Sequence, residues 1–101
     1  MDVQGVYVLE DFWARHRDAE GPLRKWLVVV RGAQWSSFLE CRKTFGSADP
    51  VKVHGNVITV FNIKGNRYRL LAAVAYPAGL VVVWRIMTHE EYSEDRWKEQ
   101  L

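Results

Sequence analysis

Polar and cationic side chains alternate along the two stretches that flank the pair Gly65-Asn66, namely Asn62, Lys64, Arg67 and Arg69. Glycine and asparagine tolerate the positive φ that a two-residue hairpin turn requires, so these stretches are predicted to pair as antiparallel strands. Asn62 would then lie opposite Arg69. Because side chains alternate between the faces of a strand, all four would project from one face of the sheet. Cations that face one another repel, so this gathering of charge predicts that the face binds an anion.

Arg85 and His89 are predicted to lie on the same face. A three-residue loop at 77–79 would place Arg85 opposite Leu71, and His89 opposite Arg67. Such a cluster suits a phosphodiester, because a guanidinium grips two phosphate oxygens and cations stabilise a pentavalent transition state. The alternative is a solvated face whose cations pair with the glutamates near the C-terminus.

Two residues after the last predicted strand could handle protons. His89 has a reference pKa near neutral and could be a general acid or base, or it could cap and pack at the strand–helix junction. Tyr92 lies one helical turn on and could hydrogen-bond a phosphate, stack on a base or belong to the core. Glu91 could orient His89, but a simple charge at the start of a helix is the favoured interpretation.

The sequence predicts neither a metal nor a cofactor. The acidic residues of 90–95 are spaced as a solvated helix face, and Gly65 stands outside any phosphate-binding glycine motif. The single cysteine, Cys41, excludes an intramolecular disulfide and is expected to be buried.

Length and composition indicate one folded domain over residues 1–101, since 49% of the residues are hydrophobic and 26% are charged. The net charge of +2 permits a nucleic-acid partner without demanding one. No apolar run approaches the roughly 20 residues that span a membrane, and no cationic leader precedes an apolar run. We therefore expect a cytoplasmic protein.

Hydrophobic spacing predicts an α+β fold in which N-terminal helices pack on an antiparallel meander and a short helix follows it. The helices are expected at 6–16, from about 22 to 32, from a cap at Ser36 or Ser37 to about 45, and after Thr88. The strands are expected at 51–54, 57–64, 67–76 and 80–87.

The two faces of this meander have different predicted roles. One face is predicted to carry the helices and gathers Phe61, Ile63, Tyr68, Leu70, Val74, Val82, Trp84 and Ile86. The cationic face is predicted to become apolar further along, through Ile58, Val60, Ala73, Val81 and Val83. A terminal helix, a partner chain or both must cover that end.

Two motifs in this arrangement resemble the HigB family of toxins from type II toxin–antitoxin systems. Residues 60–70, VFNIKGNRYRL, resemble the family pattern FNIxGNxYRL, and residues 88–92, THEEY, resemble THxEY. The resemblance implies a RelE-like fold and an mRNA interferase that cuts mRNA in the ribosomal A site. It also implies a helix-turn-helix antitoxin of the HigA type, so that DNA would be contacted only through the antitoxin.

Under this resemblance the protein is expected to be a metal-independent endoribonuclease, in which the 2′-OH of RNA attacks the adjacent phosphate. Arg69 and Arg85 would stabilise the transition state, and His89 or Tyr92 would manage protons or orient a base. The expected catalytic residues are Arg69, Arg85, His89, Tyr92 and Lys64, and the expected RNA-binding residues are Asn62, Lys64, Arg67 and Arg69.

A second hypothesis is a non-catalytic toxin or RNA-binding module that acts by binding a cellular target. The RelE superfamily also contains ParE-like toxins directed at DNA gyrase, so the fold alone does not decide the target.

Overall fold

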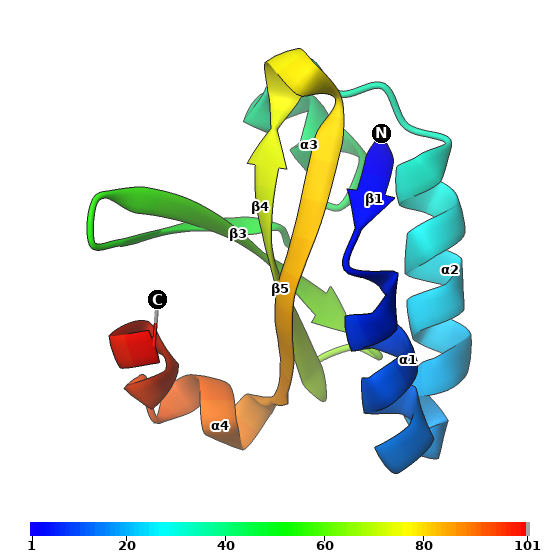
Figure 1. Ribbon diagram of the computed structural model, residues 1–101, viewed down its shortest axis with the longest axis vertical. Coiled ribbons are helices and arrows are strands. Elements are labelled where there is room, and N and C mark those ends of the chain that lie inside the picture. The colour runs from blue at the N-terminus through cyan, green and yellow to red at the C-terminus, as the bar shows by residue number, and fades with distance from the viewer. Residues whose placement is uncertain (101) are drawn as a thin grey trace.

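The computed structural model describes residues 1–100, and its α+β architecture confirms the predicted fold class (Figure 1). Five strands form one sheet in the order β1-β5-β4-β3-β2, antiparallel except for the β1–β5 pair. The strands are β1 (Asp2–Gln4), β2 (Asp49–Val53), β3 (Asn56–Ile63), β4 (Tyr68–Ala75) and β5 (Leu80–Thr88). The α-helices are α1 (Val6–Arg15), α2 (Glu20–Arg31), α3 (Phe38–Thr44) and α4 (His89–Ser93). Short 3-10 turns are η1 (Arg17–Ala19), η2 (Tyr76–Ala78) and η3 (Arg96–Gln100).

The helices α1, α2 and α3 cover one face of the sheet. Their apolar residues pack with the inward side chains of the strands around Phe61, which is 1% exposed. Trp26 from α2 meets the Phe61 ring edge-on at 5.5 Å, and Phe45, just after α3, does so at 5.2 Å. Burial of these apolar surfaces is the main force that holds the helices on the sheet.

The hairpin of β3 and β4 has the predicted pairing. Asn62 lies opposite Arg69, and Ile63 lies opposite Tyr68. Its turn is different from the prediction, because the positive φ values fall at Lys64 (53°) and Gly65 (62°), and the strands end at Ile63 and Tyr68. Lys64 and Arg67 therefore belong to the turn and not to the alternating face of the strands.

The pairing of β4 with β5 contains a β-bulge. Arg69 lies opposite Met87 and Leu71 opposite Arg85, as predicted, but Ala72 pairs with Val83, so that Trp84 is the extra residue. The loop before β5 is also one residue longer than predicted, since Ala75 pairs with Leu80. The longer loop shifts the pairing by one residue, and the bulge shifts it back. The predicted pairs are therefore retained at the cationic end of the sheet.

The bulge makes part of the predicted assignment of side chains to the two faces of the sheet wrong. One extra residue reverses which face the side chains of β5 point to on the other side of the bulge. Val81 and Val83 pack in the helix-side core, whereas they were expected on the cationic face. Trp84 packs on the opposite face, whereas it was expected beneath the helices, and Val82 does not join the helix-side core.

A second apolar core lies on the face of the sheet away from α1 and α2. Trp97 from η3, 2% exposed, packs there on Ile58, Val60, Leu71 and Met87. The C-terminal segment thus supplies the cover that the sequence predicted for this face, and Figure 1 shows it on the opposite side from α1 and α2. It is a short α4, a break at Asp95 (φ 63°) and then η3, not one continuous helix.

Two further observations concern strand β1 and the length of the helices. β1 was not predicted; it adds three residues to the edge of β5 in parallel pairing. No helix within residues 1–100 is long and apolar enough to cross a membrane.

Candidate active site

A cleft of about 340 Å³ opens on the sheet face opposite α1 and α2. It lies between the loop before β2, the paired strands β3 and β4, and helix α4. We call it the Arg69 cleft, and its lining residues are Arg42, Ser47, Ala48, Asp49, Val60, Asn62, Arg69 and Tyr92. Three of the predicted site residues, Asn62, Arg69 and Tyr92, therefore meet in one place.

Arg69 is the one charged side chain that is buried among residues 1–100, with 9% of its surface exposed. Its Nη1 donates to the carbonyl oxygens of Asn66 (3.1 Å) and Tyr68 (3.2 Å), and its Nη2 donates to Asn66 Oδ1 (2.8 Å). Within residues 1–100, no carboxylate lies within ion-pair distance of Arg69. Burying a charge is costly unless it is paired, so the site holds a positive charge fixed in place and not neutralised.

The ring of Tyr92 lies between Arg69 and Trp97. The guanidinium carbon of Arg69 is 5.7 Å from the centre of the Tyr92 ring, within the range of a cation–π contact. Trp97 stacks on the Tyr92 ring at 5.3 Å with an interplanar angle of 15°, and its Nε1 donates to the Tyr92 carbonyl at 3.0 Å. The hydrogen bond and the stacking restrict where the Tyr92 ring can move.

The Tyr92 hydroxyl is held in its protonated form. Burial raises the pKa of Tyr92 above its usual value near 10, and the negative charge of Asp49 raises it further, while Arg69 acts in the opposite direction. Tyr92 is therefore a hydrogen-bond donor at neutral pH and not a base.

Lys64 and Arg67 lie on the helix side of the hairpin turn, which corrects the prediction that they share a face with Arg69. Asp18 of η1 accounts for this position. Its Oδ2 lies 3.1 Å from Lys64 Nζ and 3.4 Å from Arg67 Nε, and its Oδ1 accepts a 2.6 Å hydrogen bond from the Tyr68 hydroxyl. Asp18 thus partly neutralises two of the predicted RNA-binding cations.

The charge on Asp18 should make the free energy of unfolding depend on pH in the acidic range. The hydrogen bond from Tyr68, assisted by Lys64 and Arg67, lowers the pKa of Asp18 below its usual value. A carboxylate with a lowered folded pKa stabilises the protein above about pH 4 and loses that contribution as the pH falls further. The variant Asp18→Asn is therefore expected to unfold at lower urea concentration than the parent at pH 7. The difference between the urea concentrations at which the parent and the variant unfold should become smaller below pH 4. A difference of the same size at pH 7 and pH 3 would contradict the expectation.

His89 lies in a different cleft, of about 370 Å³, at the junction of β5 and α4. We call it the His89 cleft, and its lining residues are His16, Arg67, Tyr68, Thr88, His89 and Glu90. The backbone N–H of His89 donates to the Arg67 carbonyl at 3.0 Å, which ties the start of α4 to the hairpin turn. His89 and Arg67 are therefore neighbours, as predicted, but His89 does not line the Arg69 cleft.

Glu91 and Arg85 have structural partners. Glu91 forms the capping box of α4 with Thr88, which confirms the simpler of its two interpretations. Arg85 donates to Gln100 Oε1 and, with Arg15 and His16, lines a third hollow beside α1. Arg85 does not line the Arg69 cleft.

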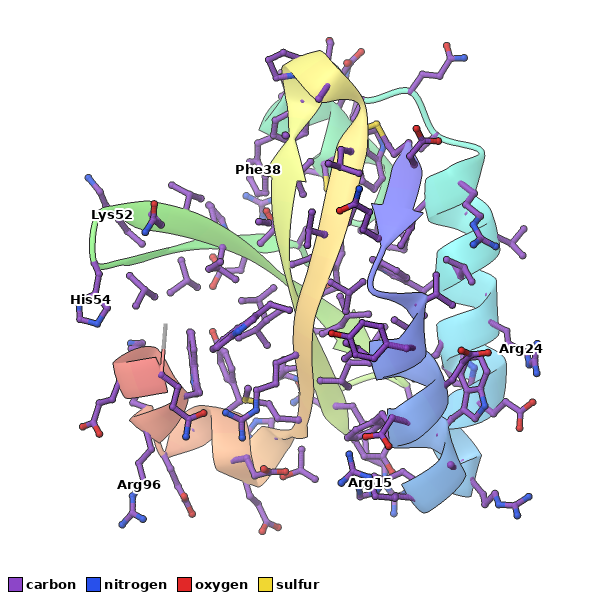
Figure 2. All side chains as sticks on the ribbon, in the orientation of Figure 1. Arg15, Arg24, Phe38, Lys52, His54 and Arg96 are labelled. Carbon is purple, nitrogen blue, oxygen red and sulfur yellow. The ribbon has the colours of Figure 1, made fainter. Side chains whose placement is uncertain are left out.

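Other sequence expectations concern single residues. Cys41 is fully buried, as expected, and burial raises its pKa to about 11, so it is an unreactive thiol at neutral pH. No group of three or more potential metal ligands gathers within residues 1–100. His54 Nε2 lies 3.0 Å from the Lys98 carbonyl, and Figure 2 shows His54 at the tip of the β2–β3 hairpin on the side of the C-terminal segment.

Comparison with known families decides what kind of protein carries this arrangement. Residues 19–95, more than half of the chain, match the family HigB_toxin, described as the RelE-like toxic component of a toxin–antitoxin system. The chain belongs to this family. It is a HigB-family toxin, and the resemblance inferred from the two motifs is confirmed. No match was found among curated proteins.

The matched region of this HigB-family toxin contains every residue that lines the Arg69 cleft and ends before Trp97. Sequence reasoning did not single out Arg42, Asp49 or Trp97 for this site. Asp49 follows α3 by several residues and reaches the cleft only because β2 pairs with β3, with Asp49 opposite Val60. A long-range strand pairing of this kind leaves no periodic signal around Asp49 itself.

Proposed function

We propose that this HigB-family toxin is an mRNA interferase whose chemistry takes place in the Arg69 cleft. One observation carries the proposal, namely the buried guanidinium of Arg69, which no carboxylate in residues 1–100 neutralises and which faces Tyr92. A fixed cation in a partly desolvated cleft is suited to the negative charge that develops on a phosphoryl group in the transition state.

The reaction is a transesterification within the RNA strand. The 2′-oxygen of one nucleotide attacks the adjacent phosphorus, and the bond from phosphorus to the 5′-oxygen breaks. The products are a 2′,3′-cyclic phosphate and a 5′-hydroxyl. Arg69 stabilises the extra charge on the phosphoryl oxygens, and the protonated Tyr92 hydroxyl gives its proton to the departing 5′-oxygen. No metal takes part in these steps.

The remaining predicted site residues hold the RNA on either side of the cleft. Asn62 is exposed beside Arg69 and offers an amide to the bound nucleotide. Lys64, Arg67 and His89 contact the flanking backbone around the hairpin turn, and Arg85 adds charge at the edge of β5. Phosphate contacts of this kind position the strand and add affinity that falls with salt.

The proposed setting follows from the family. The substrate is mRNA on the ribosome in the cytoplasm, and the inhibitor is a HigA-like helix-turn-helix antitoxin. Family membership supports an antitoxin as partner, and the cationic cleft supports an RNA substrate.

The test is induced expression with mapping of RNA ends, with and without the adjacent antitoxin gene. Growth arrest with cuts inside codons, 5′-hydroxyl ends and 2′,3′-cyclic phosphates is the expected result. A 5′-phosphate at the cuts would indicate water-mediated hydrolysis and contradict the mechanism. Intact mRNA with arrested growth would favour the alternative, a non-catalytic ParE-like toxin that acts by binding its target.

A further inference from the structure

We propose that Asp49 is the general base that removes the proton from the attacking 2′-hydroxyl. This inference rests on the proposed function and assigns a step that Arg69 and Tyr92 leave open. Asp49 is the single carboxylate among the residues that line the Arg69 cleft. It begins β2 and lies opposite Val60, so a strand pair of the sheet holds its backbone in place.

The carboxylate of Asp49 is free to accept a proton. Within residues 1–100 it forms neither an ion pair nor a side-chain hydrogen bond. The carboxylates of Asp18 and Glu91, by contrast, are occupied: Asp18 binds Lys64, Arg67 and Tyr68, and Glu91 caps α4. A base has to keep its lone pairs available until the substrate arrives, and Asp49 does so.

The other titratable groups that line the cleft do not meet this requirement, and neither does His89. Arg42 from α3 and Arg69 from β4 are permanent cations and cannot accept a proton. Tyr92 from α4 remains protonated, because burial and the nearby negative charge of Asp49 raise its pKa. His89 lines a separate cleft.

The proposed step is balanced without any further reactant. Asp49 takes the proton of the 2′-hydroxyl while the 2′-oxygen forms its bond to phosphorus, so the carboxylate becomes a carboxylic acid. The bond to the 5′-oxygen breaks, and Tyr92 supplies the proton for that oxygen. The proton on Asp49 then passes to the tyrosinate directly or through water, and both groups return to their starting states.

The decisive variant is Asp49→Asn, because its two possible effects have opposite signs. If Asp49 were only a surface charge, its removal from an RNA-binding cleft would reduce repulsion of phosphate and raise cleavage. As a general base, its loss is expected to lower the single-turnover rate of mRNA cleavage about 10²–10³-fold, with RNA affinity unchanged or increased. The variant Asp49→Glu should recover part of the rate.

Glu94→Gln is the matched control, since it removes one exposed negative charge two residues from Tyr92 and should keep the parent rate. Measurements of the parent rate from pH 8 to 5.5 separate a carboxylate base from the alternative of an imidazole base such as His89. An imidazole base loses about tenfold in rate one unit below pH 6.5, whereas a carboxylate base does not.

The outcomes separate the two proposals. An active parent and an Asp49→Asn variant within threefold of it would overturn the assignment of Asp49 and leave the proposed function intact. A loss explained by weaker RNA binding, or by unfolding seen in circular dichroism, would overturn it as well. A parent that cleaves no RNA would overturn both proposals together.

Discussion

Replacing Arg69 by alanine is expected to lower the rate of mRNA cleavage on ribosomes by about 10²–10³-fold, the usual cost of removing one group that stabilises transition-state charge. Arg69 supplies a buried cation that no carboxylate in residues 1–100 pairs with. The measurement is a single-turnover cleavage assay at saturating toxin. Cleavage by Arg69→Ala at the parent rate would eliminate Arg69 from the mechanism.

Two further variants separate charge from geometry at this position. Arg69→Lys keeps a positive charge but cannot donate at once to the Asn66 and Tyr68 carbonyls and the Asn66 side chain, so an intermediate rate is expected. Arg67→Ala is the matched control, because Arg67 is already paired with Asp18 and lies in the turn. The loss of cleavage rate in Arg67→Ala should be tenfold or less and should diminish as salt is raised.

Arg69 also holds the hairpin turn, so urea unfolding must accompany each assay. The free energy of unfolding of Arg69→Ala is expected to be about 1–3 kcal/mol lower than that of the parent.

The second large effect is expected from the hydroxyl of Tyr92. Tyr92→Phe keeps the ring that stacks on Trp97 and faces Arg69, and removes the proton that we assign to the departing 5′-oxygen. The rate is expected to fall about 10²-fold with little change in stability. Since the pKa of Tyr92 is raised, the parent should show no decline attributable to this group up to about pH 9. A decline between pH 7 and 9 that Tyr92→Phe abolishes would contradict the assignment.

His89→Gln tests the alternative proton carrier. His89 lines the cleft that also contains Arg67 and His16, and it does not line the Arg69 cleft. We expect a reduction of tenfold or less, through weaker binding of flanking RNA. A loss larger than that of Tyr92→Phe would reverse the two roles.

Local chemistry predicted much of this fold. The Gly65-Asn66 pair located the central hairpin, and the alternation around it gave the right partners for Asn62 and Phe61. Helical spacing located α1 and α2, and the Ser37 and Thr88 caps located the starts of α3 and α4. These features depend on contacts between residues close in sequence, which periodicity and capping describe well.

Non-local features were beyond such reasoning. The bulge at Trp84 has no local signature, yet it exchanges the faces of Val81, Val83 and Trp84. Strand β1 has only three residues, and its partner is almost eighty positions away. For the site, alternation correctly brought Asn62 and Arg69 together but could not show that Asp18 draws Lys64 and Arg67 to the helix side.

The stacking of Tyr92 on Trp97 also determines when the cleft can exist. A single domain generally folds as a unit. Trp97, which restrains the Tyr92 ring, packs in the second core on residues of β3, β4 and β5. The cleft is therefore complete only when the C-terminal segment has packed on the assembled sheet. The toxin gains its proposed activity in the fully folded domain and not in a sheet that lacks this segment.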